Sequence, residues 1–157
     1  MKSTLKNSLL PTACCLLIAS FWLLATGFSS ANPGGELKLT INNIYPIKGE
    51  LYIAVYDNEK DFMNIEKTAF RKIVPVEDET QVVVFENVPS GEYAISIFQD
   101  LDGNGKLDER KSGIPSEPFG FSNDARGKLG PPKFKKARFE LNGNMSISLR
   151  MVNNAEK

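Results

Sequence analysis

Apolar and polar residues alternate along most of the chain, and this period of two predicts β-strands that are buried on one face. The pattern begins at residues 37–41 and returns at 51–55, with a turn signal at 46–49 between them, so these two segments predict a strand pair. It resumes at 70–74 and stops at Pro75, which predicts an edge strand or a strand end.

Further segments extend the strand pattern toward the C-terminus. Residues 81–88 are rich in valine, and residues 92–99 alternate after a Pro-Ser-Gly turn. Residues 134–141 and 145–151 flank the sequence Asn142-Gly143-Asn144, a strong turn signal, and they predict a closing hairpin. No segment predicts a long helix, so the expected fold is all-β, an antiparallel immunoglobulin- or transthyretin-like β-sandwich of about seven strands.

Two segments interrupt the alternation. Residues 57–67 are dense in charge and predict one helical turn or a compact loop pinned by Phe62. Residues 109–133 are rich in glycine and proline and too long for an ordinary connection, which indicates a functional or a disordered loop. We expect one long ordered loop, because it carries four apolar side chains that can anchor it: Ile114, Phe119, Phe121 and Leu129.

The first 31 residues have the pattern of a secretory signal peptide. Lys2 and Lys6 precede an apolar run at 9–25, and the small residues Ser29 and Ala31 predict cleavage after Ala31. The alternative is a membrane anchor, but the run is short for the roughly 20 residues of a spanning helix, and no basic cluster follows it. We therefore expect an exported protein, periplasmic or secreted, without stable membrane insertion after cleavage.

The predicted mature chain consists of one sandwich domain at 32–152 and a flexible tail at 153–157, and we expect a monomer. Removing the two leader lysines from 19 basic residues leaves 17 against 19 acidic ones, a net charge near −2 that does not indicate nucleic acid binding. The chain has no histidine, and both cysteines, at positions 14 and 15, lie in the leader. This composition excludes disulfides, catalytic triads, cysteine nucleophiles and the usual zinc ligand sets from the mature protein.

An acidic loop follows the segment 92–99 and has the spacing of a calcium (Ca2+) site. Oxygen ligands are expected at alternate positions, because a tightly turning backbone points alternate side chains inward: Asp100, Asp102, Asn104, Asp108 and the backbone carbonyl of Lys106. Gly105 stands at the sixth position, where the loop bends sharply. The twelfth position holds Lys111 in place of the bidentate glutamate of an EF-hand loop, so the match is partial.

Other oxygens can complete the coordination shell of this loop. The candidates are Glu109, which is adjacent, and Asn123 and Asp124, which come from the later part of the chain. The alternative is a turn without metal, since Asp, Asn and Gly are common in turns for conformational reasons.

Five segments together resemble a bacterial secreted family of uncharacterised proteins, domain of unknown function 2141: 49–57, 88–95, 99–108, 120–127 and 130–132. The resemblance spans roughly residues 37–149 and implies an exported protein of unknown activity. The Pro-Ser-Gly-Glu-Tyr sequence also resembles transthyretin-like and carboxypeptidase-regulatory-like sandwiches. The transthyretin-related hydrolase activity depends on histidines, which this chain lacks.

Two other groups of residues have both a structural and a functional interpretation. The first group is a run of basic residues: Arg126, Lys128, Lys133, Lys135, Lys136 and Arg138. We interpret this run as a solvated edge strand, and the alternative is that it attracts an anionic ligand. The second group contains the aromatic residues Tyr93, Phe119 and Phe121. We interpret them as anchors of the long loop, and the alternative is a platform that binds a sugar or peptide. Phe119, Phe121 and Arg126 are therefore secondary candidates for ligand binding.

Three functions are consistent with these features. The first is a non-enzymatic exported sandwich whose acidic loop binds structural calcium and orders an adjacent recognition loop for an envelope protein or a glycan. The second is a metal-assisted hydrolase in which Arg126 or Lys128 orients an anionic substrate. The third is a structural sandwich whose acidic turn binds no metal. We favour the first, with no catalytic residues.

Overall fold

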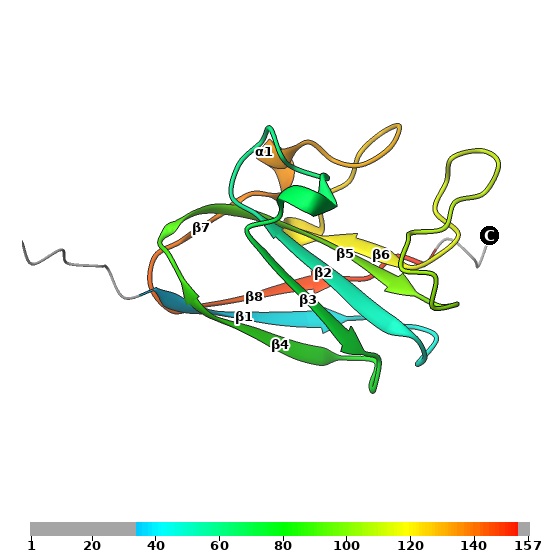
Figure 1. Ribbon diagram of the computed structural model, residues 1–157, viewed down its shortest axis with the longest axis horizontal. Helices are drawn as coiled ribbons and strands as arrows, with labels where there is room; N and C mark the ends of the chain where they lie inside the picture. The colour runs from blue at the N-terminus through cyan, green and yellow to red at the C-terminus, as the bar shows by residue number, and fades with distance from the viewer. Residues whose placement is uncertain (1–33, 154–157) are drawn as a thin grey trace, which may run out of the picture. The chain divides into compact units, whose positions relative to one another are not determined.

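Two β-sheets pack against each other in the computed structural model, which describes residues 34–153 (Figure 1). This arrangement confirms the predicted all-β sandwich, with eight strands instead of about seven. The predicted signal peptide at 1–31 lies outside the described residues, as do residues 154–157 of the predicted tail. No helix among the described residues has the length and apolar character needed to cross a membrane.

The smaller sheet has three strands in the order β4-β1-β8. They are β1 (Gly35–Asn42), β4 (Gln81–Val88) and β8 (Met145–Arg150). β1 is antiparallel to β4 and parallel to β8. The sandwich is therefore mainly antiparallel, with one parallel pair that joins the first strand to the last.

The larger sheet has the order β3-β2-β5-β6, and β7 pairs with the first residues of β5. Its strands are β2 (Glu50–Tyr56), β3 (Phe70–Pro75), β5 (Gly91–Asp100), β6 (Phe119–Phe121) and β7 (Phe139–Leu141). β3 lies at an edge, as Pro75 predicted. Short helical turns lie in the connections: η1 (Ile65–Lys67), η2 (Ser122–Asp124) and α1 (Phe134–Ala137).

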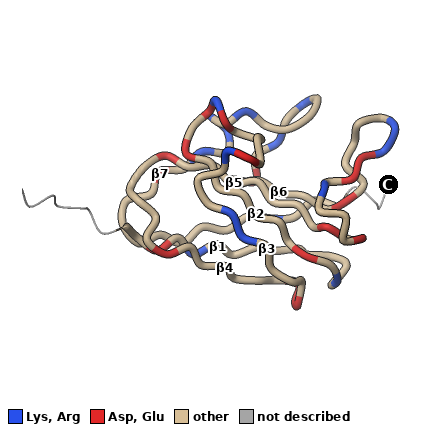
Figure 2. Tube along the Cα trace, viewed as in Figure 1, with Lys and Arg blue, Asp and Glu red and all other residues tan. Residues whose placement is uncertain are grey.

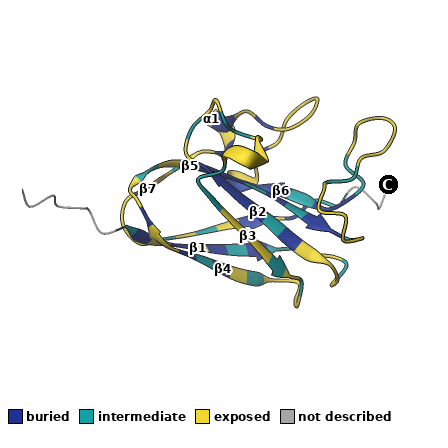
Figure 3. Ribbon diagram, in the orientation of Figure 1, coloured by how far each residue is buried: buried dark blue, intermediate teal, exposed yellow. Residues whose placement is uncertain are grey.

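The main core lies between the two sheets and is built from alternate residues of the central strands (Figure 3). Nine of these side chains come from β1, β2 and β5: Leu37, Leu39, Ile41, Leu51, Ile53, Val55, Tyr93, Ile95 and Ile97. Because successive residues of a strand point to opposite faces, the period of two in the sequence becomes one buried face on each sheet.

A second, smaller core covers part of the outer face of the larger sheet. It contains Tyr56 of β2, Ala94 of β5, Phe121 of β6 and Phe134 of α1. Phe62 packs on them from the loop at 57–64, with its ring centroid 5.3 Å from that of Tyr56 and 5.7 Å from that of Phe134. The expected loop pinned by Phe62 is therefore present, and β2 and β5 are covered on both faces.

The predicted strand pair at 37–41 and 51–55 is wrong. These segments are β1 and β2, which belong to different sheets and face each other across the core. The chain crosses between the sheets at 43–49, where the Gln99 amide donates hydrogen bonds to the carbonyls of Pro46 (2.6 Å) and Lys48 (2.7 Å). Facing strands and paired strands share the same period of two, so the pattern alone does not identify the partner.

The predicted closing hairpin at 134–141 and 145–151 is also wrong. Residues 134–137 form the helical turn α1, β7 pairs with β5, and β8 pairs with β1 in the other sheet. The Asn-Gly turn crosses between the sheets, because β7 and β8 belong to different sheets. The side-chain oxygen of Asn144 accepts a hydrogen bond from the N–H of Glu36 (2.9 Å) in β1. Local turn geometry fits both a hairpin and this crossing.

Candidate metal centre and the pocket beside it

Strand β5 ends at Asp100, whose carboxylate organises the loop that follows. Its side chain is only 1% exposed, and its two oxygens accept hydrogen bonds from the N–H groups of Gly103 (2.8 Å) and Gly105 (2.7 Å). Both glycines have positive φ, 79° and 73°, which a side chain would disfavour. The two hydrogen bonds and the two glycines thus fold the chain back over the end of β5.

The environment of Asp100 favours its charged form. Burial raises the pKa of the Asp100 carboxyl. Hydrogen bonds from the backbone N–H groups of Gly105, Gly103, Asp102 and Asn104 together lower the pKa by more than burial raises it, so the net pKa lies below the ordinary value. A buried carboxylate is therefore kept ionised in a nest of backbone donors.

Asn104 connects the other predicted ligands of the loop. Its side-chain nitrogen donates to Asp102 Oδ2 (3.2 Å) and to Asp108 Oδ1 (3.0 Å), and its side-chain oxygen accepts the N–H of Lys106 (2.8 Å). The structure therefore brings the predicted residues of the acidic loop together in one hydrogen-bonded turn.

Glu117 is the residue of this site that the sequence analysis missed. It is 4% exposed, and its carboxylate oxygens accept the N–H groups of Leu101 (2.7 Å) and Asp108 (3.0 Å). One ligand atom each from Asp100, Asp102 and Glu117 lies within 4.8 Å of the others, a spacing compatible with a single cation between them. We call these three residues the carboxylate cluster.

A small hairpin at 108–116 carries Glu117 back to the loop. The N–H of Ser116 donates to the carbonyl of Asp108 (2.8 Å), and Glu109 forms a β-bridge with Pro115. The N–H of Gln99 then donates to the carbonyl of Pro118 (2.8 Å), so both ends of the excursion are fixed on β5. Lys111, the twelfth position of the EF-hand pattern, lies exposed at the tip of this hairpin.

The three other predicted ligands have different surroundings. Asn123 donates to the carbonyl of Arg138 (2.8 Å), and Asp124 accepts the N–H of Arg150 (2.7 Å), so both contact the segment after α1 or the end of β8. Glu109 is exposed and lines the pocket described below. The structure thus places Glu117, and none of these three residues, in the carboxylate cluster.

Acidic and basic residues lie on several loops, including the loop beyond β5 (Figure 2). The ion pairs between described residues join Lys67 to Asp61 (3.2 Å) and Arg138 to Glu92 (3.0 Å), and neither involves the carboxylate cluster. Two of the three clustered carboxylates are buried, and burying charge is costly unless an opposite charge or several hydrogen bonds compensate it. An all-oxygen, negatively charged site of this kind suits a hard cation such as calcium.

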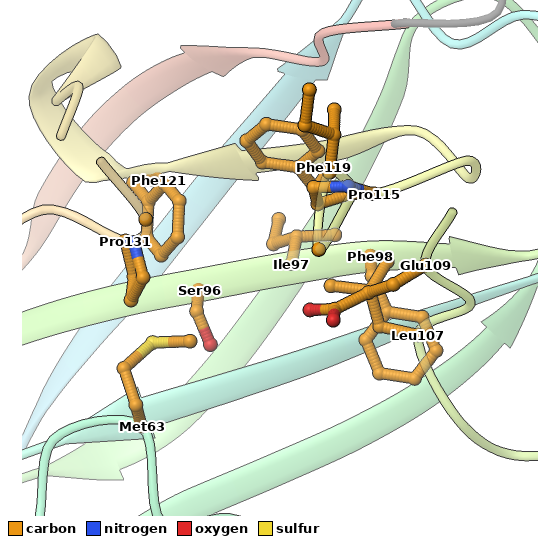
Figure 4. A pocket seen from close by; sticks show the side chains of 13 residues that line it. Met63, Ser96, Ile97, Phe98, Leu107, Glu109, Pro115, Phe119, Phe121 and Pro131 are labelled. Atoms are coloured by element: carbon orange, nitrogen blue, oxygen red, sulfur yellow. The ribbon is translucent and has the colours of Figure 1, made fainter. Parts of the chain in front are cut away.

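A pocket of about 330 Å³ lies on the outer face of the larger sheet, between the hairpin 108–116 and the second core (Figure 4). Phe98 and Phe119 line it from β5 and β6, and Phe121, which belongs to the second core, closes one side. Leu107 and Glu109, on either side of Asp108, complete the wall next to the acidic loop.

One family model matches this chain. It is described as "Uncharacterized protein conserved in bacteria (DUF2141)" and covers residues 39–148. The chain belongs to this family. The match confirms the resemblance noted in the sequence and includes the whole acidic loop, Glu117 and every residue that lines the pocket. No curated protein and no solved structure matches the chain.

The remaining sequence candidates of this DUF2141 member divide between the core and the surface. Phe119 and Phe121 line the pocket, whereas Tyr93 lies in the main core and Arg126 is not among the residues that line the pocket. The prediction that Leu129 and Ile114 anchor the long loop is wrong, since their exposures are 101% and 48%. The positions of apolar residues in a loop sequence do not determine which of their side chains are buried.

The basic run does not form an edge strand. Lys135 and Lys136 lie on the helical turn α1, and Lys133 is the residue before it. Arg138 pairs with Glu92 on β5, and the side chain of Lys136 donates to the carbonyl of Arg126 (3.4 Å). Arg138 therefore contacts β5 and Lys136 contacts the long loop, and neither lies on an edge strand.

Proposed function

We propose that this protein is an exported, non-enzymatic β-sandwich that binds calcium at the carboxylate cluster. The bound cation orders the adjoining hairpin 108–116, and the ordered hairpin forms part of a recognition surface for a partner in the cell envelope, either a protein or a glycan. The metal has a structural role in this proposal.

The observation that carries the proposal is the convergence of Asp100, Asp102 and Glu117. The first two come from the spacing expected of a calcium loop, while Glu117 arrives from a separate hairpin and supplies the carboxylate that Lys111 cannot. Each carboxylate oxygen keeps lone pairs beyond those used by the backbone N–H groups, so the existing hydrogen bonds and a cation are compatible.

We expect calcium to contribute modestly to the stability of the fold, because the acidic loop is already held by its own hydrogen bonds. For the dissociation constants of extracellular calcium modules, roughly 0.1–1 mM, millimolar calcium stabilises the folded state by about 0.4–1.4 kcal/mol. The two cores do not depend on the loop, so the sandwich is expected to stay folded after calcium is removed.

A structural role is favoured over the metal-assisted hydrolase. The carboxylates of Asp100 and Glu117 each accept two backbone hydrogen bonds and stabilise the loop itself. Arg126 and Lys128, which that mechanism would use to orient an anion, do not line the pocket beside the site. The proposal of export rests on the leader-like sequence of the first 31 residues.

Calorimetric titration of calcium into the chelator-treated protein tests the proposal. We expect saturable binding with a dissociation constant in the range of about 0.1–1 mM, and slower proteolysis of the hairpin 108–116 when calcium is present. Asp102→Asn should abolish both effects, whereas Glu86→Gln, an exposed carboxylate on β4, should leave them unchanged. Absence of saturable heat at millimolar calcium would reduce the acidic loop to a structural turn.

A further inference from the structure

The pocket beside the hairpin is bounded by five separate parts of the chain. Its floor is formed by Ser96, Ile97 and Phe98 of β5, and Phe119 and Phe121 of β6 form the side next to them. The hairpin 108–116 closes one end, and Met63 and Pro131 reach over the other end from two loops (Figure 4). A volume of about 330 Å³ is within the range typical of small-molecule sites.

The lining of this pocket is almost entirely apolar. Three phenylalanine rings contribute, and the ring centroids of Phe119 and Phe121 are 6.1 Å apart at an interplanar angle of 68°. Apart from Glu109, Ser96 is the one hydroxyl-bearing or charged side chain among the 13 described lining residues. A sugar needs several polar partners, so this lining favours an apolar ligand over a glycan.

Glu109 gives the pocket its electrostatic character. It is the one charged side chain among the described lining residues, and its carboxylate points into the pocket, between Ser96 and Phe98 (Figure 4). A positive group next to this carboxylate would also lie near aromatic rings, whose faces attract cations. An anionic ligand would meet repulsion at the same place.

We propose that this pocket binds a small apolar molecule that carries a positive charge, such as an aromatic amine. The apolar part of the ligand lies against Phe98 and Phe119, and its ammonium group lies at the Glu109 carboxylate. The pocket has a limited volume and one charged side chain in an apolar lining, and both features favour a small ligand. A protein partner would need a broader surface to be buried.

The pocket and the metal site share the hairpin, and this part of the inference rests on the proposed function. Leu107 and Glu109 line the pocket, while Asp108 between them donates its N–H to Glu117 of the carboxylate cluster. Calcium that orders this segment would hold both pocket residues in place. Calcium and the amine should therefore each increase the affinity for the other.

Titration of the full chain with 1-naphthylmethylamine tests the pocket, and 1-naphthaleneacetate, which has the same ring system and a negative charge, is the matched ligand. We expect saturable amine binding, with NMR shift changes at Phe98 and Phe119, and little binding of the carboxylate. Glu109→Gln should weaken amine binding by about three- to fivefold, the size of a partly exposed charge pair. Glu86→Gln should have no effect. Equal affinity for the two ligands, or an unchanged affinity in Glu109→Gln, would overturn the proposal.

The same titrations in chelator and in millimolar calcium separate the two proposals. Amine binding in both conditions that is tighter with calcium supports the shared hairpin. Amine binding that calcium does not change supports the pocket and overturns the coupling through the hairpin. Absence of saturable calcium heat in a protein that binds the amine supports the pocket and overturns the metal site. Saturable calcium binding with no amine binding supports the metal site and overturns the pocket.

Discussion

Glu117 accepts a hydrogen bond from the backbone N–H of Asp108 (3.0 Å), nine positions earlier in the chain. Its other carboxylate oxygen accepts the N–H of Leu101 (2.7 Å), so one buried side chain holds both the beginning and the end of the acidic loop. Glu117 therefore has two roles in our proposal, as the clamp that shapes the loop and as the third carboxylate of the metal site.

Glu117→Gln is expected to weaken calcium binding by about tenfold or more, because it removes one of the charges that set the affinity of such a loop. Glu109→Gln should change calcium affinity by less than about twofold, since Glu109 faces the pocket and contributes at most a screened charge. Calorimetric titration of both variants measures the difference. The opposite ranking, in which Glu109→Gln binds calcium more weakly than Glu117→Gln, would show that Glu109 is a calcium ligand, as the sequence suggested, and that Glu117 is not.

Asp100 is expected to make the protein less stable in acid. Its pKa in the folded state lies below that of the unfolded chain, so its contribution is fully present above the unfolded pKa of about 3.9 and is lost as the pH falls through the folded pKa. Asp100→Asn should lower stability near neutral pH by about 1–3 kcal/mol, because the amide cannot replace both acceptors.

Asp100→Asn should also flatten the loss of stability below about pH 4. Urea unfolding in chelator, from neutral pH to acid, measures both effects without a contribution from metal. The exposed variant Glu86→Gln should keep the acid dependence of the wild type. An unchanged acid dependence in Asp100→Asn would show that other carboxylates control it.

Ser122→Ala is expected to destabilise the fold by about 1–3 kcal/mol, the cost of leaving buried polar groups without partners. The Ser122 hydroxyl is fully buried, accepts the N–H of Ile95 (2.9 Å) and donates to the carbonyl of Ala137, so it joins β5 to α1. Urea midpoints provide the measurement, and Ser148→Ala on the exposed face of β8 serves as the control. Matching midpoints for the two variants would refute this role.

Strand positions could be predicted from the sequence, but strand partners could not. The alternation at 37–41 and 51–55 correctly placed β1 and β2, because each buries one face in the same core. The same alternation does not distinguish a neighbour in the sheet from a strand on the opposite sheet. The Asn-Gly turn before β8 was misleading for this reason, since its local geometry fits a crossing between sheets as well as a hairpin.

The acidic loop was predictable because its ligands lie within nine consecutive residues, where spacing alone determines their proximity. Glu117 was not, because its position depends on the hairpin 108–116 and on the pairing of β6 with β5. One signal was present: Glu117 stands in the short sequence Pro115-Ser116-Glu117-Pro118-Phe119, where an isolated charge among prolines and an aromatic residue is unusual. Asn123 and Asp124 are close in sequence to this segment, but Asn123 contacts Arg138 after α1 and Asp124 contacts Arg150 of β8.

The parallel pairing of β1 with β8 also sets the order in which the domain can fold. The first strand has the last strand as its neighbour, and the hydrogen bond from Glu36 to Asn144 spans 108 positions of the chain. This pairing cannot form until the whole domain has been synthesised, and contacts between residues so distant in sequence place folding on a timescale of about milliseconds to seconds. Until β8 arrives, β1 has an open edge, so a chain that ends before β8 should be prone to aggregate through that edge.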